Sequence, residues 1–387
     1  MNRRQFLRFI SAAGLSACAL PTHTRARESM DKPIWDWGRL PPRVFKERTE
    51  GPSIVGTSHA PNPFSIDVEQ LVREAVEKGG GLDKVIRSGD TVLIKPNLVS
   101  NTPNGTGATT DVRVAEAVAK MALDCGAKRI VFAEGSSTNR GQKSYSSDVT
   151  ERCFSESGYA DLAKKMGANL VDFNDAGEKP GGRELVKNVD LKYGLKKKSY
   201  WISKHLFDAD CVISVPVFKN HRLAGVTLSL KNYIGIAPAD IYQAPRVTPS
   251  KFGLDHSTLG LAQHIVDLVM IRPPDYTIID ALVGLASGDK YPWYAGPKGR
   301  MRAIIAGRDP VAVDTVACIT MSYDPKTIGH LVLASAVGLG VSDPKGIEVR
   351  GAGIEAFQQE FPIPVAGSWY RPGRYGQRPE LGIWGQT

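Results

Sequence analysis

The stretch TVLIKPN, residues 91–97, is a short apolar run that stops at a lysine, a proline and an asparagine. Continuous apolar runs of this length are typical of strands that are buried on both faces of a sheet. Comparable runs recur along the chain: RIVFAEG (129–135), ANLVDF (168–173), CVISVPV (211–217), YTIIDAL (276–282) and RAIIAG (302–307).

Amphipathic segments separate these runs. Apolar residues repeat at helical spacing over residues 68–76 and 114–122, and further helices are predicted at Thr258 to Ile271 and at Pro310 to Met321. Alternation of strands and helices predicts an α/β fold with a mainly parallel sheet and helices on both faces. The pattern fits one large domain or two fused domains.

Composition points to a globular protein with a small ligand. The chain has 387 residues, of which 42% are hydrophobic, and a formal net charge of +9. Part of the excess lies at the start of the chain, where Arg3, Arg4, Arg8, Arg25 and Arg27 crowd together, so the remainder is only mildly basic. This favours a small anionic ligand and argues against nucleic acid as a partner.

The first residues resemble a twin-arginine export signal. NRRQFLRFISAAGLSACAL (2–20) pairs Arg3 with Arg4 ahead of an apolar stretch that ends in small residues. The apolar part is shorter than the roughly 20 residues that a membrane-spanning helix needs, so no span is expected in the mature chain. We expect export through the twin-arginine machinery to the periplasm or cell envelope. The processing site is left open: cleavage at Ala19, cleavage at Ala26, or lipidation of Cys18 as in a lipoprotein.

Four segments are expected along the chain. They are the signal segment 1–26, a linker or arm 27–52, an α/β domain 53–350 and an aromatic and basic tail 351–387. The cysteines beyond the signal are scattered singly and form no CxxC motif, so no iron-sulphur cluster is expected and buried free thiols are the default.

Polar side chains follow every predicted strand. In an open parallel sheet, ligands bind outside the carboxyl ends of the strands, where these side chains would converge. Each group alone fits an ordinary polar loop equally well. In chain order they are Lys95 and Asn97; Glu134, Ser136 and Ser137; Asn174 and Asp175; Lys219, Asn220 and His221; Asp280; Arg308 and Asp309.

Several local predictions depend on this arrangement. His221 is the best single candidate for a general acid or base, because an unperturbed imidazole titrates near neutrality. Residues 227–230 alternate in polarity and predict an extended segment that returns Lys231 and Asn232 to the same edge. Asp309, just before a proline, is expected to cap a helix, and Asp314 to face a lysine or solvent. The glycine-bearing loop 100–111 feeds a helix that Thr110 or Asp111 would cap.

Six motifs together resemble a known family. They are KPNLV (95–99), TD (110–111), EGS (134–136), KNH (219–221), LKN (230–232) and AGRDPVAVD (306–314). In this order they resemble the bacterial and archaeal family called domain of unknown function three-six-two, from about residue 54 to 350. Many relatives carry ferredoxin-like cysteine motifs, which this chain lacks. The resemblance implies the fold and the position of the site, whereas the family has no established reaction.

The leading hypothesis is an exported enzyme that performs acid-base chemistry on a small anionic substrate. Lys95, His221 and Lys231 are the predicted catalytic residues, and Lys95 could instead only extend its amine to solvent. A divalent metal is an open alternative. The predicted substrate-binding residues are Asn97, Lys219, Asn220 and Asn232; the candidate metal ligands are Glu134, Asp280 and Asp314. The alternative functions are a non-catalytic ligand-binding protein of the cell envelope and a partner-binding protein that uses the tail.

Overall fold

A central sheet organises the chain, which we describe from a computed structural model. The structure describes residues 43, 51–137, 148–177, 182–243, 251, 253–286, 297–299 and 301–362. The predicted signal segment with Cys18, most of the predicted linker and the tail beyond residue 362 lie outside the described residues.

Eleven strands of the described residues form this sheet, and eight of them follow the order β13-β1-β12-β10-β7-β2-β3-β4. All neighbours in this row are parallel except at β12, which is antiparallel to both β1 and β10. The bounds are β1 Ser53–His59, β2 Thr91–Pro96, β3 Arg129–Glu134, β4 Asn169–Asp172, β7 Cys211–Val215, β10 Tyr276–Leu285, β12 Ala303–Gly307 and β13 Ile347–Gly351. The prediction of an α/β fold with a mainly parallel sheet is confirmed.

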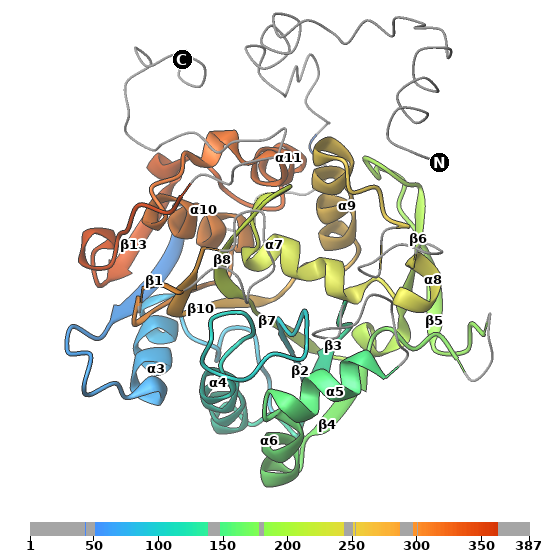
Figure 1. Cartoon of the computed structure of the whole chain (residues 1–387), viewed down its shortest axis with the longest axis horizontal. Helices are drawn as coiled ribbons and strands as arrows, with labels where there is room; N and C mark the ends of the chain where they lie inside the picture. The colour runs from blue at the N-terminus through green and yellow to red at the C-terminus, as the bar shows by residue number, and fades with distance from the viewer. Residues whose placement is uncertain are drawn as a thin grey trace, which may run out of the picture. The chain divides into compact units, whose positions relative to one another are not determined.

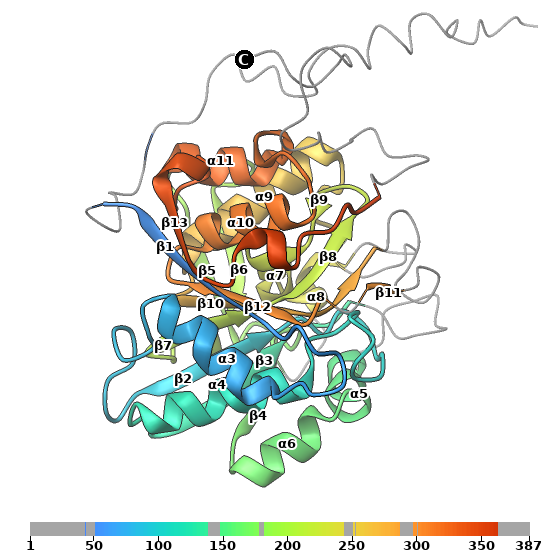
Figure 2. The same ribbon diagram turned by 90° about the vertical axis from the view of Figure 1, so that its left-hand side faces the viewer.

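Helices cover both faces of the sheet (Figures 1 and 2). One face carries α3 Val68–Lys78, α4 Val112–Asp124, α5 Val149–Glu156 and α6 Tyr159–Met166. The other face carries α7 Leu228–Asn232, α9 Thr258–Ile271, α10 Pro310–Thr320 and α11 Gly329–Val337. The helices predicted from the four amphipathic segments are therefore all present.

Amphipathic spacing explains how α3 meets the sheet. The helix buries Val68, Leu71, Val72, Ala75 and Val76 and begins where the Asp67 side chain accepts a hydrogen bond from the backbone of Gln70. Its last turn presses on β1 at Gly56, where a Cβ atom would lie 2.0 Å from the Ala75 carbonyl oxygen. Only glycine allows the helix and strand to approach this closely.

Smaller elements complete the structure around the carboxyl ends of the parallel strands. β8 Val217–His221 continues the chain direction of β7 after a proline, pairs in parallel with β10, and pairs antiparallel with β9 Gly225–Val226. β11 Pro297–Gly299 pairs with β10. A separate hairpin joins β5 Val186–Asp190 to β6 Ser199–Ser203, and α8 spans Ala239–Tyr242.

Two sequence-based predictions about local structure are wrong. Residues 228–232 form the helix α7 instead of an extended segment, and Leu228 enters it with a φ of 44°. Because β12 is antiparallel to β10, its carboxyl end pairs with the start of β10, Gly307 against Thr277. Arg308 and Asp309 therefore lie at the opposite edge of the sheet from the other predicted site residues.

Candidate functional site

A buried ion pair joins the ends of β2 and β3. The Lys95 amine lies 2.8 Å from Glu134 Oε1 and 2.9 Å from Oε2, and the two side chains are 0% and 3% exposed. Glu134 also accepts hydrogen bonds from the backbone of Leu98 and Gly135. Burial lowers the pKa of Lys95, and the charge of Glu134 opposes that shift.

The peptide after α7 lies directly on this pair. This segment is a short 3₁₀ turn, Tyr233–Ile236, and a Cβ atom on its Gly235 would lie 2.1 Å from Glu134 Oε1 and 2.6 Å from the Lys95 amine. A side chain at position 235 would therefore displace the ion pair. Glycine lets the backbone seal the pair from solvent.

Two asparagines connect Lys95 to a second lysine. The Oδ1 atom of Asn232 accepts from Lys95 at 3.2 Å and from Asn97 Nδ2 at 3.1 Å. Asn97 Oδ1 in turn accepts from the Lys219 amine at 2.9 Å. The Asn232 amide nitrogen donates to the backbone oxygen of Lys95 and to Ser214, which fixes the orientation of the amide. The structure thus brings four predicted site residues together.

Lys219 and Lys231 form the part of the site whose charge is not balanced. Lys219 is buried, and its amine donates to Asn97 Oδ1 and to the Ala108 carbonyl at 3.0 Å. Lys231 is half-buried at the end of α7. Within the described part of the chain, neither amine forms an ion pair with a carboxylate. Burial, together with the charge of Lys231, lowers the pKa of Lys219 to about 7, and burial lowers that of Lys231 to about 8.

His221 ends β8 beside these lysines. Its Nδ1 atom accepts hydrogen bonds from the backbone of Leu223 and Ala224 at 3.1 and 3.2 Å, a pattern that assigns the proton to Nε2. Burial and the charges of Lys231 and Lys219 lower the pKa of His221 well below its ordinary value. The ring is therefore neutral and offers an N–H group.

Unsatisfied hydroxyl groups border Lys219. The side-chain oxygens of Thr109 and Thr227 are buried without a hydrogen-bond partner among the described residues. Thr109 follows the carbonyl that Lys219 contacts, and the Thr227 backbone donates to the Lys219 carbonyl. Most buried polar groups in native proteins are hydrogen-bonded, so these two hydroxyl groups are exceptions that call for an explanation.

Asn220 contacts the C-terminal segment. Its amide nitrogen donates to the Pro362 carbonyl and to the Tyr323 hydroxyl, both at 3.1 Å, and Tyr323 donates to the same carbonyl at 2.7 Å. Phe361 packs edge-on against Phe218 with ring centroids 5.4 Å apart. Unlike Asn97 and Asn232, Asn220 therefore holds the segment of Phe361 and Pro362.

The three candidate metal ligands are not brought together. Glu134 holds Lys95, as described above. Asp280 accepts from the backbone of Asp111 and Leu282, and Asp314 from that of Ser229 and Leu230. Burial raises the pKa of Asp280 to about 7 and that of Asp314 to about 8. Across the described ranges, no group of three or more His, Cys, Asp or Glu residues could hold a metal ion.

The predicted helix caps are confirmed. Asp111 caps α4 by accepting from the Arg113 backbone, and Asp309 caps α10 by accepting from Val311 and Ala312. Asp314 meets neither of its predicted partners, because the backbone at the start of α7 occupies its carboxylate. The cysteines at positions 125, 153, 211 and 318 are free thiols, and all but Cys125 are buried.

Two buried basic residues near the site, Lys251 and His330, were not predicted from the sequence. The Lys251 amine donates to the carbonyls of Gly135, Ile234 and Gly235 at 2.6, 3.4 and 3.2 Å. His330 lies in the first turn of α11 and is fully buried. For His330, the available signal was a histidine within a largely apolar helical segment, GHLVLASAV (329–337).

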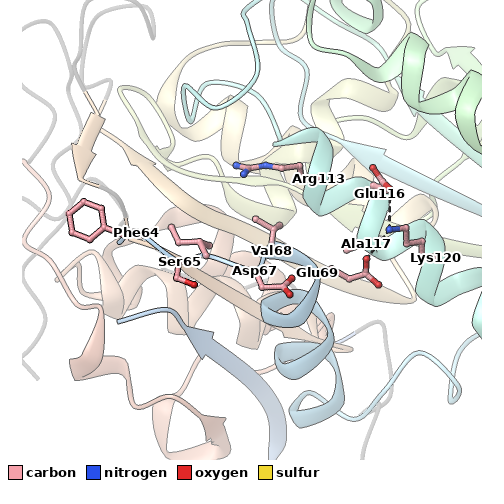
Figure 3. A pocket seen from close by; sticks show the side chains of 10 residues that line it. Phe64, Ser65, Asp67, Val68, Glu69, Arg113, Glu116, Ala117 and Lys120 are labelled. Carbon is pink, nitrogen blue, oxygen red and sulfur yellow. Dashed lines mark hydrogen bonds and ion pairs between the residues drawn. The ribbon is translucent and has the colours of Figure 1, made fainter. Parts of the chain in front are cut away.

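A groove between α3 and α4 lies apart from this site. It has a volume of about 590 Å³ and is lined by residues 64–69 of the α3 approach and by Arg113, Glu116, Ala117 and Lys120 of α4 (Figure 3). None of the predicted site residues lines it. Among the described helices, none has the length and apolar character needed to cross a membrane.

The family of the chain follows from comparison with known proteins. Residues 92–319 match the family described as "Domain of unknown function (DUF362)". The chain belongs to this family. It is 26% identical over 268 residues to a thylakoid-associated protein of Synechocystis sp. (strain ATCC 27184 / PCC 6803 / Kazusa), covering 69% of this chain and 74% of that protein. The predicted resemblance is thereby confirmed.

A distant structural likeness is also found. The lactate racemase apoprotein from Thermoanaerobacterium thermosaccharolyticum matches with a TM-score of 0.41 and 13% sequence identity. The match covers 73% of this chain and 61% of that chain, so this DUF362 protein spans less than two thirds of the racemase.

Proposed function

We propose that this DUF362 protein is an enzyme that moves a proton on a small carboxylate substrate bound between Lys219 and Lys231. The observation that carries the proposal is the pair of neighbouring lysines with no carboxylate partner among the described residues. An anionic substrate would supply the missing negative charge. The enclosing side chains would exclude water and strengthen that attraction.

Hydrogen bonding favours Lys219 as the base. A neutral amine has two N–H groups and one lone pair. Both N–H groups of Lys219 have acceptors, Asn97 Oδ1 and the Ala108 carbonyl, so the lone pair is directed away from them. With a pKa of about 7, a large fraction of this amine is neutral at physiological pH. This exchanges the roles expected from the sequence, in which Lys219 binds and Lys231 catalyses.

Lys231 and His221 would bind the substrate anion. Lys231 has the higher pKa of the two lysines, about 8, and is therefore the more often charged at neutral pH. The His221 ring would donate its Nε2 proton to a substrate oxygen. The Lys95–Glu134 pair and the two asparagines would position Lys219 without touching the substrate.

Two measurements test this role. In the first, lysine carbons next to the amines are labelled with ¹³C and followed by NMR across pH. The Lys219 signal, assigned by its loss in Lys219→Met, should titrate near pH 7. A Lys219 midpoint near the ordinary value would refute the assignment of the base.

In the second measurement, carboxylates with an acidic C–H group next to a carbonyl are incubated in D₂O and followed by proton NMR. The wild type should exchange that hydrogen, Lys219→Met should lose exchange, and Lys231→Met should mainly raise KM. Lys165→Met is the matched control. Tight retention of an anion without exchange would instead support the ligand-binding alternative.

We also propose export by the twin-arginine route, which rests on the adjacent Arg3 and Arg4 before an apolar stretch. Fractionation of the native host should find the protein in the periplasm or cell envelope. The paired substitution Arg3→Lys with Arg4→Lys should retain it in the cytoplasm. Mass measurement of the exported chain would decide between cleavage at Ala19, cleavage at Ala26 and a lipid on Cys18.

A further inference from the structure

The hairpin of β5 and β6, with the residues that flank it, carries a concentrated positive charge. Between Arg183 and Lys204 the sequence has seven basic residues and two acidic ones, whereas the rest of residues 51–387 has 32 basic and 33 acidic residues. The hairpin is a two-stranded sheet of its own and lies at the right-hand edge of Figure 1. Beyond residue 50, the positive excess is therefore gathered on one peripheral element.

Most of this charge lies in the loop that closes the hairpin. The loop spans residues 191–198, and its ends are joined by a hydrogen bond from the Leu191 backbone N–H to the Lys198 carbonyl at 2.8 Å. Inside it, the Gly194 N–H donates to the Leu191 carbonyl at 2.9 Å. Four exposed lysines project from this short loop, and they are called the tip lysines below: Lys192, Lys196, Lys197 and Lys198.

Carboxylates balance little of the charge of the tip lysines. Across the described residues only Lys196 of the four forms an ion pair, with Asp255 at 2.7 Å. The Lys198 amine donates instead to the Gly194 carbonyl at 3.0 Å, and the amines of the other two lie over aromatic rings. Like charges held this close repel one another and create a positive potential around the loop. An anionic partner would relieve that repulsion.

A buried aspartate on α9 fixes the backbone of the loop. Asp267 accepts from the backbone N–H groups of Leu195, Lys196 and Lys197 at 2.5, 2.9 and 3.0 Å. The same carboxylate accepts from the Tyr200 hydroxyl at 2.8 Å. A loop that is already ordered loses no backbone entropy when a partner binds. The tip lysines are thus presented on a preformed backbone, and only their side chains have to adapt.

The aromatic rings around the hairpin already carry cations of the chain itself. Bases of a single-stranded nucleic acid would stack on such rings, so a ring face under a cation is less available to them. Six of the seven basic residues are lysines, which are compact point charges and lack the planar fork with which arginine recognises one fixed geometry. Both features favour a phosphate-bearing surface without fixed geometry over nucleic acid. The cations lie 5.2–5.4 Å from the ring centroids: Arg183 over Trp201, Lys187 over Phe207, Lys192 over Tyr193 and Lys197 over Tyr242.

We infer that the tip lysines and Tyr193 dock this protein on the surface of a bilayer that contains anionic phospholipid. Groups of four or more basic residues beside a membrane are attracted by its acidic headgroups. The lysine amines would lie among the headgroup phosphates. Tyr193 is 46% exposed, and its amphipathic ring is of the kind enriched at membrane–water interfaces. This role is separate from the proposed reaction at Lys219 and does not depend on it.

The probe is a vesicle of phosphatidylcholine and phosphatidylglycerol in equal amounts, sedimented with the full chain. Vesicles of phosphatidylcholine alone are the uncharged reference. The wild type should bind the anionic vesicles and leave the reference vesicles largely free. Binding should be lost in concentrated salt, because the screening length falls to about 3 Å at 1 M.

The first residues of the chain are also basic, so the contact has to be located residue by residue. Acetylation of lysine amines with and without vesicles, read by peptide mass spectrometry, does this on the full chain. The tip lysines should be protected by the anionic vesicles. Lys78, Lys128 and Lys164 are exposed and form no ion pair within the described ranges, so they are the internal reference and should react equally in both samples.

A triple variant removes the tip charges that have no carboxylate partner in the described structure: Lys192→Gln, Lys197→Gln and Lys198→Gln. Each basic residue near an anionic surface contributes about fivefold in affinity, so the variant should bind the anionic vesicles at least about tenfold more weakly. The matched control removes the same charge elsewhere, by Lys78→Gln, Lys128→Gln and Lys164→Gln, and should bind like the wild type. Circular dichroism and the thermal midpoint check that both variants are folded.

A single-stranded oligonucleotide tests the rival partner. It should bind the full chain more weakly than anionic vesicles at the same phosphate concentration. Tighter binding of the oligonucleotide that disappears in the tip variant would assign the surface to nucleic acid and overturn the inference. Tip lysines that stay reactive on anionic vesicles, or equal vesicle affinity of the two triple variants, would also overturn it.

Discussion

The ends of β2 and β3 and the ends of β8 and α7 hold buried or half-buried lysines in opposite electrostatic settings. Lys95 has a carboxylate within 2.8 Å, whereas Lys219 has only an amide and a carbonyl oxygen as acceptors. A buried charge that is paired contributes to a rigid framework. A buried charge left without a counter-charge is a cost to folding that a ligand can relieve. The comparison favours a structural role for Lys95 and is the reason for proposing a chemical role for Lys219.

The largest effect is expected from breaking the compensated pair. Lys95→Met leaves Glu134 buried with only backbone donors and should lower the free energy of unfolding by about 3–5 kcal/mol. Urea unfolding at neutral pH measures it. The double variant Lys95→Met with Glu134→Leu should recover much of the loss, because neither charge then remains. A single variant as stable as the wild type would contradict the structural role of the pair.

Removal of Lys219 should raise the free energy of unfolding, the opposite of the effect expected for Lys95→Met. Its pKa falls from an ordinary 10.5 to about 7 on folding, so the unfolded chain binds more protons between these values. Stability should therefore rise with pH across this window, by up to about 1.4 kcal/mol per pH unit from this group. Lys219→Met should lose that contribution and be more stable than the wild type at pH 7. Lys165→Met, on the surface, should keep the wild-type slope.

A smaller effect is expected at the helix that carries Lys231. Asp314 accepts from two backbone N–H groups at the start of α7, and Asp314→Asn can accept from only one of them. We expect a loss of about 1–3 kcal/mol at pH 5 in urea unfolding. Because burial raises the pKa of Asp314 from 3.8 to about 8, wild-type stability falls as pH rises through this range. The deficit of the variant should shrink above pH 8; a constant deficit would contradict this account.

The extent to which sequence predicts this molecule depends on the range of the interaction. Apolar runs such as residues 91–97 specify buried strands locally, and Asp111 and Asp309 cap their helices through neighbouring backbone groups. The direction of β12 is set by its partners β1 and β10, which its own residues do not encode. The alternation at residues 227–230 suggested a strand, and contacts from Asp314, over 80 residues away, hold a helix there instead.

For the same reason, the candidate site could be predicted from the sequence only in part. The convergence of Lys95, Asn97 and Lys219 followed from the rule for parallel strand ends. Asn232 was expected at the same edge through an extended segment, and the helix α7 brings it there instead. Tertiary neighbours decide which lysine has a carboxylate partner. They also decide which histidine lacks a hydrogen-bond partner among the described residues. His330 is a polar residue in a largely apolar helix, and this signal fits a packed core histidine as well as a functional one.

The smallest effect is expected where ion pairs are exposed. Lys120 on α4 bonds to Glu69 at 2.8 Å and to Glu116 at 3.1 Å in the groove of Figure 3, and all three side chains are in part open to solvent. Water and salt screen such pairs, and ordering the long side chains offsets the attraction. Lys120→Met should therefore leave the urea midpoint unchanged within error, with or without added salt. A loss comparable to that of Lys95→Met would show that the number of ion-pair contacts, and not their burial, determines which lysines hold this fold together.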